Sequence, residues 1–500
     1  MDLKVIQGNV TQVKSDVLIL NYFENSRRMG RETAKVDKAL GGAISQLIKK
    51  GEIKGKHKEI TLIYTLGKLP SSKVAIAGMG KKTELTLDKL RTAVAEVCKI
   101  LRQKGAEAVD SVAHGADIDG LELEDIGQAV TEGALLGSYT FRKHITKVPD
   151  YKEIRQFNIL STGKNNLAAL DRGCQRGKII SEAVNLVRDM VNEPANILTP
   201  TAMAEIARQL GQKYSLEVKI LEREEMHNLG MGGLLSVAQG SQQPPKLIVM
   251  SYQGRETTDL DIALVGKGIT FDAGGISLKP SENMVEMKGD MAGGASVMGA
   301  ISAIAQFKPR INVSAIVPAA ENLPSGTAMH PGDIIKIMNG KTVEIISTDA
   351  EGRLILADAL SYGCQMGARK IVDVATLTGA CKVALGDVCT GAFGNNQELV
   401  KKIVTAGAEC GECIWPMPMN DEYKEQNKSD VADIKNTGGR NASPITAALF
   451  LAEFVDHTPW VHLDIGGTYI IDKDRGYQVK GATGVSVRAL VNLVLSLAEK

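Results

Sequence analysis

The sequence lacks the features that direct a chain into or across a membrane. No stretch approaches the roughly 18 uninterrupted apolar residues that a membrane-spanning helix requires. The first sixteen residues contain no basic head followed by an apolar run, so no secretory signal is predicted. We therefore expect a cytoplasmic protein that does not associate with membranes.

Cysteine is scarce and irregularly spaced, with seven residues in a chain of 500. The number is odd, and a chain of this length does not need disulfides to compensate for a small core. We therefore expect the cysteines to be reduced. Cys410 and Cys413 form a single C-x-x-C pattern without a second pair, which supports neither a zinc site nor a redox pair.

An excess of charge of one sign is also absent, because 59 basic residues face 58 acidic residues. This balance gives no support to a protein devoted to nucleic acid. A short basic stretch contains Lys49, Lys50, Lys54, Lys56 and Lys68. We interpret it as solvated surface.

Three catalytic signatures are missing as well. No H-E-x-x-H occurs, which excludes that type of histidine-based zinc protease, and no G-x-S-x-G occurs, which argues against a serine nucleophile of the α/β-hydrolase type. The segment 266–270 has glycines around Lys267, but the upstream glycine of a phosphate-binding loop is missing.

The length of the chain and its apolar pattern predict two α/β domains. Five hundred residues exceed what one hydrophobic core usually serves. In the first 165 residues, predicted strands (16–23, 73–78 and 157–161) alternate with predicted helices (36–48, 87–103 and 125–136). This alternation is typical of a largely parallel sheet.

A connecting segment and a second, larger α/β domain follow. The polar stretch 161–166 begins the passage, and apolar residues recur at helical spacing from Ile180 to Val191, ahead of Pro194. A further helix is predicted to begin at Thr199 and Pro200. The predicted later strands are 216–221, 246–252, 261–266, 311–317, 343–347 and 370–375, and the predicted helices are 291–306, 354–366 and 485–498. The expected boundaries are thus 1–165, 166–194 and 195–500.

Charged residues stand where three apolar strands should end. Asp349 and Glu351 are separated by one residue, so they point to the same side if the chain there is still extended. Together with Asp272 and Asp290 they supply four carboxylates, whose repulsion a pair of divalent cations would relieve. Each carboxylate alone is more often a turn residue or a helix cap, so spacing alone suggests a metal site without proving one.

The segments that contain these residues resemble the three site motifs of the leucyl (cytosol) aminopeptidase family, in the same order and with the same separation. The three motifs are VGKGITFDAGG (265–275), MKGDMAGG (287–294) and STDAEGRL (347–354). The resemblance continues through DMVNEPAN (189–196), VATLTGA (374–380), WVHLDIGG (460–467) and GATGVSVR (481–488). It covers nearly everything from about residue 180 to the end. The first domain resembles the family's more variable, macro-like domain only in its general α/β pattern.

The resemblance implies a larger catalytic domain with a mixed sheet flanked by helices, and a centre of two divalent ions, Mn²⁺ or Zn²⁺. Lys267, Asp272, Asp290 and Glu351 would hold the tightly bound ion. Asp272, Asp349 and Glu351 would hold the more exchangeable one.

The same resemblance implies roles for two cations that are not metal ligands. Lys279 would stabilise the oxyanion that forms at the scissile carbonyl, and Arg353 would hold a bicarbonate ion that acts as general base. The implied activity is the metal-dependent release of N-terminal residues from peptides. Without the motif, surface ion pairs would be the better interpretation of both side chains.

The implied substrate pocket favours leucine and other apolar residues. The residues that match the family's substrate-binding positions are Met287, Thr376, Leu377, Gly379 and Ala380. One residue departs from the pattern, because Ser347 stands where the motif usually has asparagine. Serine is shorter but also forms hydrogen bonds, so the departure concerns rate or preference and leaves the metal ligands intact.

The family assembles as hexamers, so the resemblance implies a homohexamer. Some bacterial relatives bind DNA, which makes a DNA-binding regulator or recombination accessory protein the alternative function. Binding of a nucleotide or of ADP-ribose by the first domain is a third interpretation, for which no specific motif is present.

Overall fold

The structure is a computed structural model that describes residues 1–161, 163 and 166–498. The chain forms two compact units. The first contains residues 1–182 and 472–480, and the second contains residues 183–471 and 481–500. Among the described residues, no helix has the length and apolar character needed to cross a membrane.

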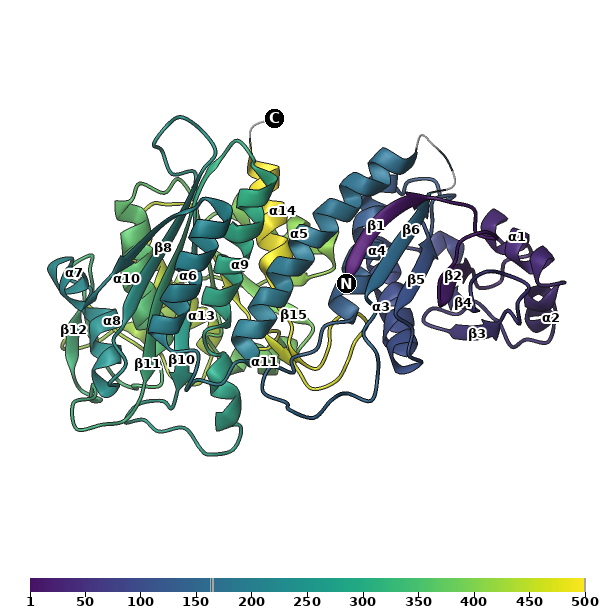
Figure 1. Ribbon diagram of the computed structural model, residues 1–500. Coiled ribbons are helices and arrows are strands. Elements are labelled where there is room, and N and C mark those ends of the chain that lie inside the picture. The colour runs from purple at the N-terminus through teal and green to yellow at the C-terminus, as the bar shows by residue number, and fades with distance from the viewer. Residues whose placement is uncertain (162, 164–165, 499–500) are drawn as a thin grey trace. The chain divides into compact units, whose positions relative to one another are not determined.

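The first unit is built on a six-stranded sheet in the order β1-β6-β5-β2-β4-β3 (Figure 1). Its strands are β1 (Asp2–Gln7), β2 (Val17–Tyr22), β3 (Ile60–Tyr64), β4 (Lys73–Gly78), β5 (Ala108–Val112) and β6 (Gln156–Ser161). All neighbours pair in parallel except β3 with β4. The largely parallel sheet expected from the sequence is confirmed.

Helices cover both faces of this sheet. One face packs against α3 (Leu87–Gln103), α4 (Leu123–Gly137) and the start of α5 (Leu167–Asn192). The other face packs against α1 (Arg31–Ala39) and α2 (Ala43–Lys49). A single helix was predicted over 36–48, and this is wrong because Gly41 and Gly42 both adopt positive φ and break the helix in two.

Helix α5 belongs to both units, since the division falls within it. It ends at Asn192, as the following proline predicts. The polar stretch predicted at 161–166 lies partly outside the described residues. Helix α6 (Pro200–Tyr214) begins where predicted, with the Thr199 hydroxyl accepting a hydrogen bond from the amide of Ala202 at 3.2 Å.

The second unit is built on a nine-stranded mixed sheet, with the order β16-β15-β18-β14-β9-β11-β8-β7 and β10 paired with β11. Figure 1 labels β8, β10, β11 and β15 of this sheet. Its strands are β7 (Glu217–Leu221), β8 (Lys246–Gln253), β9 (Ile262–Gly266), β10 (Gly268–Asp272), β11 (Asn312–Asn322), β14 (Ile371–Ala375), β15 (Cys389–Gly394), β16 (Cys413–Pro416) and β18 (Trp460–Asp464). The central strands β18, β14, β9, β11 and β10 are parallel, whereas β8, β7 and β15 run antiparallel to their inner neighbours. The expected mixed sheet is confirmed.

Helices cover both faces of the second sheet as well. One face packs against α7 (Arg223–Asn228), α8 (Gly232–Val237), α10 (Glu351–Gln365) and α13 (Ser443–Ala452). The strands also contact α6, α9 (Ala292–Phe307) and α12 (Gln397–Cys410), and α14 (Val487–Leu497) packs on α9 and α12. Strands β9, β11 and β14 are buried along their whole length, which fixes their ends in place.

Smaller elements complete the second unit. The predicted strand 343–347 is shorter than expected, and it forms β13 (Thr342–Glu344) between β12 (Ile334–Lys336) and β17 (Ile434–Lys435). Helix α11 (Gly379–Leu385) follows β14. Strands β19 (Ile470–Ile471) and β20 (Gly481–Ala482) form a separate pair.

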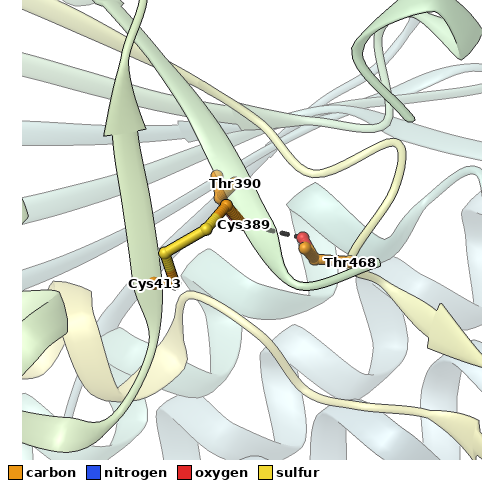
Figure 2. The surroundings of a disulfide bond; sticks show 4 residues. All are labelled: Cys389, Thr390, Cys413 and Thr468. Carbon is orange, nitrogen blue, oxygen red and sulfur yellow. Dashed lines mark hydrogen bonds between the residues drawn. A yellow bond between two sulfur atoms is a disulfide. The ribbon is translucent and has the colours of Figure 1, made fainter. Parts of the chain in front are cut away.

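One pair of cysteines corrects the expectation that all of them are reduced. Cys389 begins β15 and Cys413 begins β16, and the register of these parallel strands sets the two side by side. They form a disulfide across Cα atoms that are 4.7 Å apart (Figure 2). Cys410, the other member of the C-x-x-C pattern, is buried outside any disulfide, and its thiol donates to the carbonyl of Gly407 at 3.2 Å.

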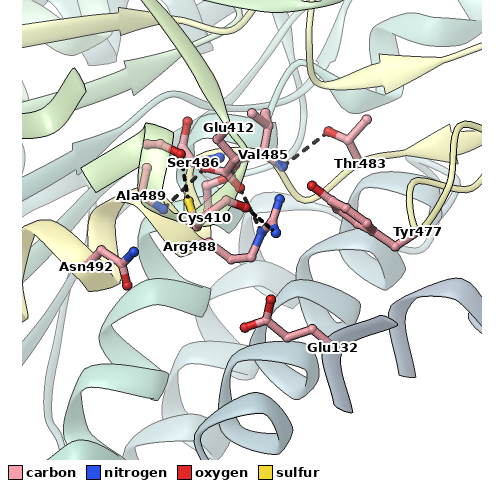
Figure 3. Close-up of polar contacts among 12 residues, drawn as sticks. Glu132, Cys410, Glu412, Tyr477, Thr483, Val485, Ser486, Arg488, Ala489 and Asn492 are labelled. Atoms are coloured by element: carbon pink, nitrogen blue, oxygen red, sulfur yellow. Dashed lines mark hydrogen bonds and ion pairs between the residues drawn. The ribbon is translucent and has the colours of Figure 1, made fainter. Parts of the chain in front are cut away.

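A buried carboxylate organises the start of the last helix. Glu412 accepts hydrogen bonds from the backbone amides of Ser486 and Ala489, at 3.1 and 3.2 Å, and from the guanidinium of Arg488 at 3.3 Å (Figure 3). Arg488 also donates to the carbonyl of Cys410 at 2.7 Å. Glu412 thus caps the positive end of α14 and ties it to the end of α12.

We predict that Glu412→Ala destabilises the protein by about 3 kcal/mol, because it removes a carboxylate that pairs with a buried cation and leaves two buried amides without an acceptor. The free energy of unfolding, measured by urea denaturation, checks this. Glu409→Ala removes an exposed glutamate from the preceding helix and serves as the control. Equal unfolding midpoints for the two variants would contradict this role of Glu412.

Candidate metal centre

The predicted site residues follow the carboxyl ends of parallel strands in the second unit. Lys267 joins β9 to β10, Asp272 ends β10, and Thr376 follows β14. Because β9, β10, β11 and β14 are parallel, their carboxyl ends point toward the same end of the sheet, where β10 continues the line of β9 along β11. In open α/β sheets this edge is where ligands bind.

Three of the four predicted carboxylates converge there. Asp272, Asp290 and Glu351 each offer an oxygen within 4.8 Å of the others, and all three are buried. Asp290 ends the 3₁₀ turn Met284–Gly289 ahead of α9, and Glu351 is the first residue of α10. Helices α9 and α10 therefore begin beside the cluster, and the positive ends of their dipoles favour negative charge there.

Two lysines supply positive charge to the cluster. The Lys267 ammonium is 2.7 Å from Asp290 Oδ2 and 2.8 Å from Glu351 Oε1. The Lys279 ammonium is 2.8 Å from Asp272 Oδ2 and also pairs with Asp349. Four carboxylates and two ammonium groups leave two negative charges unbalanced.

The backbone of Gly352 lies close to the side chain of Lys267. A Cβ added at Gly352 would lie 2.7 Å from Lys267 Nζ. Glycine at this position therefore lets the first turn of α10 approach the amine closely.

Burial and the neighbouring charges shift the pKa values of the carboxylates and lysines in the cluster. Burial raises the pKa of Glu351, and the Asp272 carboxylate raises it further. Burial likewise raises the pKa of Asp290 and of Asp349, against the opposing effect of a lysine in each case. Burial alone would lower the pKa of Lys267, but the carboxylates of Asp290, Glu351 and Asp272 outweigh it and raise the pKa above its ordinary value. The same balance raises the pKa of Lys279.

Asp349 occupies a different position from the three buried carboxylates. Its side chain is 37% exposed, and it reaches the cluster through Lys279. The Ser347 hydroxyl accepts a hydrogen bond from the Asp349 amide at 3.3 Å. Ser347, which departs from the family pattern, therefore stabilises the turn that contains Asp349.

Arg353 lies in the first turn of α10 and is buried. Its Nη1 donates to the carbonyl of Asn436 at 2.7 Å. Its Nε has no hydrogen-bond partner in the described part of the chain. A buried guanidinium nitrogen in this state is suited to an anion.

The predicted substrate-binding residues lie in two segments next to the cluster. Thr376 donates its hydroxyl hydrogen to Asp290 Oδ1 at 2.7 Å, and its carbonyl accepts from Lys267 at 3.2 Å. Met287 is half-buried in the 3₁₀ turn that ends at Asp290. Leu377 follows Thr376, and Gly379 and Ala380 begin α11. Their contacts with a substrate stay a prediction.

The structure adds two buried residues to the site that the sequence did not indicate. Asn322 donates from its side-chain amide to Asp272 Oδ1 at 2.9 Å. Asp464 accepts the hydroxyl of Thr378 at 2.7 Å and the amide of Leu377 at 3.3 Å, which fixes the segment after β14. Both stand at strand ends, which is the signal that identified Asp272. The predicted strand 311–317 stopped too early to include Asn322, because β11 continues through Pro318.

The donor set fits divalent metal ions. Carboxylate oxygens and an amine are acceptable ligands for Mn²⁺ and Zn²⁺, and the cluster has an excess of negative charge. The four carboxylates also fall into two pairs, because Lys267 contacts Asp290 and Glu351 whereas Lys279 contacts Asp272 and Asp349.

Comparison with known proteins identifies the family of the chain. The chain matches the model of the cytosol aminopeptidase family catalytic domain over residues 185–491 and that of its N-terminal domain over residues 19–147. A probable cytosol aminopeptidase of Alkaliphilus metalliredigens is 45% identical over 499 residues, covering 99% of this chain and 100% of the relative. One of Geobacter sulfurreducens is 45% identical over 492 residues, covering 98% of both chains.

Solved structures give the same result. A mutant of tomato leucine aminopeptidase has a TM-score of 0.88 and 34% sequence identity, covering 99% of this chain and 96% of its own. The bottromycin maturation enzyme BotP in complex with Mn has a TM-score of 0.85 and 31% identity, covering 97% of this chain and 100% of its own. The resemblance stated from the motifs is confirmed: the chain belongs to the cytosol aminopeptidase family and is a hydrolase of the leucyl aminopeptidase type.

Proposed function

We propose that this aminopeptidase removes leucine and other apolar N-terminal residues from peptides with the help of two divalent metal ions. The observation that carries the proposal is the buried group of Asp272, Asp290 and Glu351, whose oxygens converge within 4.8 Å. A cluster of like charges at this depth is stable only with compensating positive charge. Mn²⁺ and Zn²⁺ are the ions proposed.

In this proposal Lys267, Asp272, Asp290 and Glu351 hold the tighter ion, and Asp272, Asp349 and Glu351 hold the exchangeable one. Lys267 donates a lone pair only when it is neutral, so it releases its proton when it becomes a ligand. When bound, the ions supply polarisation of the scissile carbonyl, a water that is more acidic, and an anchor for the free amine of the substrate.

The remaining residues orient the substrate and complete the proton transfer. Lys279 is 22% exposed and pairs with both Asp272 and Asp349, so it lies beside both proposed ion positions and stabilises the negative charge that develops on the carbonyl oxygen. Arg353 holds a bicarbonate ion as general base, which its buried Nε supports, since that atom has no hydrogen-bond partner among the described residues. Met287, Thr376, Leu377, Gly379 and Ala380 line the pocket for the first side chain of the substrate.

A cytoplasmic location and assembly as a homohexamer are proposed from the family resemblance. The short basic stretch around Lys49 is the one sequence feature cited above that favours the DNA-binding alternative. Aminopeptidase chemistry is therefore the function to test first.

We predict that metal-free protein does not hydrolyse leucine p-nitroanilide and that activity returns when Mn²⁺ or Zn²⁺ is added. The double variant Asp349→Ala, Glu351→Ala should show no turnover with either ion, because it removes a ligand of each proposed position. Glu409→Ala, which removes an exposed carboxylate of the same unit, serves as the control. Turnover that survives both chelation and the double substitution would rule out the two-metal proposal.

We predict that Lys279→Ala lowers kcat by about 100-fold to 1000-fold, because it removes a group that stabilises the transition-state oxyanion. Steady-state kinetics on leucine p-nitroanilide measure this, and the metal content of the variant should equal that of wild type. A change confined to KM would instead assign Lys279 to substrate binding alone.

We predict that N-acetyl-leucine p-nitroanilide is not hydrolysed, because acetylation removes the amine lone pair that anchors the substrate. The comparison is made at equal concentrations of free and acetylated substrate. Comparable rates for both would show that a free N-terminus is not required.

A further inference from the structure

Asn322 lies between two carboxylates that come from different parts of the chain. Its Nδ2 is 2.9 Å from Asp272 Oδ1, 3.3 Å from Glu351 Oε2 and 3.0 Å from the carbonyl oxygen of Thr348. The side chain is buried, as are both carboxylates. The amide therefore joins the end of β10 to the turn that begins α10.

The three acceptors determine how the amide is oriented. The Thr348 carbonyl can only accept, so the NH₂ group must face it. The two N–H groups of the amide donate to three oxygens. The contacts with Asp272 and Thr348 are shorter, and the contact with Glu351 is longer. The amide contributes donors to this side of the cluster without adding negative charge.

This arrangement determines which oxygen of Asp272 is available to a cation. Oδ1 accepts from Asn322 and also from the amide of Gly274, at 2.9 Å each. Oδ2 accepts no neutral donor among the described residues, and it pairs with Lys279 at 2.8 Å. The two hydrogen bonds thus hold the carboxylate so that Oδ2 faces the positive charge.

The backbone fixes Asn322 independently of its side chain. Asp272 and Asn322 are register partners on the parallel strands β10 and β11. The Asn322 carbonyl accepts from the amide of Ala273 at 2.9 Å. The amide is therefore part of a rigid strand end, which is what a group that orients metal ligands requires.

We propose that Asn322 is a positioning residue of the metal centre, which orients Asp272 and Glu351 so that their remaining oxygens bind the ions. This inference rests on the proposed function, because it takes the cluster to be the metal site. Hydrogen-bond partners of metal ligands typically contribute 10-fold to 100-fold to metal affinity.

The test is a titration of metal-free protein with Mn²⁺, in which isothermal calorimetry measures the binding affinity. We expect Asn322→Ala to weaken Mn²⁺ binding by about 10-fold to 100-fold. The matched control is Asn312→Ala, at the other end of the same strand. Asn312 is also a buried amide that donates to two carbonyls, those of Thr257 and Asp259, but within the described part of the chain it does not contact the carboxylates of the cluster. We expect it to change the affinity by less than about 3-fold.

Unchanged Mn²⁺ affinity in Asn322→Ala, or an equal loss in Asn312→Ala, would overturn the assignment. Thermal unfolding of the metal-free variants shows whether each is folded. If Asn322→Ala does not fold, Asn322→Leu fills more of the space without providing a donor and should show the same loss. Failure of the proposed function is a separate result, since wild-type protein would then bind no Mn²⁺ or would bind it without hydrolysing the anilide.

Discussion

Repulsion among three buried carboxylates is the constraint on which the second unit depends. Asp272, Asp290 and Glu351 lie closer together than like charges tolerate at that depth without compensation. The ammonium groups of Lys267 and Lys279 balance only part of this charge. The cluster is therefore an energetic cost to the protein, which the metal ions of the proposed function would offset, and the surrounding structure must hold it against relaxation.

The mixed sheet provides that resistance. Strands β9, β11 and β14 are covered on both faces, so their carboxyl ends cannot move without disturbing the core. Helix α10 begins at Glu351 and helix α9 begins two residues after Asp290, so their N-terminal dipoles favour the negative charges. Asn322 and Thr348 then connect the strand end to the start of α10 through hydrogen bonds. The stability of the fold and the geometry of the site thus depend on the same elements.

Much of this was accessible from the sequence, because apolar periodicity and the motifs report local structure directly. The helix predicted over 87–103 and the strand predicted over 73–78 match α3 and β4 residue for residue. Pairings between distant segments were not accessible. Nothing near Asn322 indicates that its amide reaches Glu351, and nothing near Cys389 indicates that the register of β15 sets it beside Cys413. Such contacts follow from the order and register of the strands, which periodicity does not encode.

Unequal access to water gives the two proposed ion positions different properties. The position that includes Lys267 and Asp290 is enclosed, since these side chains are 4% and 7% exposed. The position that includes Asp349 is open, since that carboxylate is 37% exposed and its partner Lys279 is 22% exposed. When an ion leaves a site of buried ligands, several charged groups lose the positive charge that compensated them in a medium of low dielectric constant. At an exposed carboxylate, water can take the place of the lost partner. Burial alone therefore supports one tight and one exchangeable position. In the proposed function, a substrate that enters from solvent would meet the exchangeable one first.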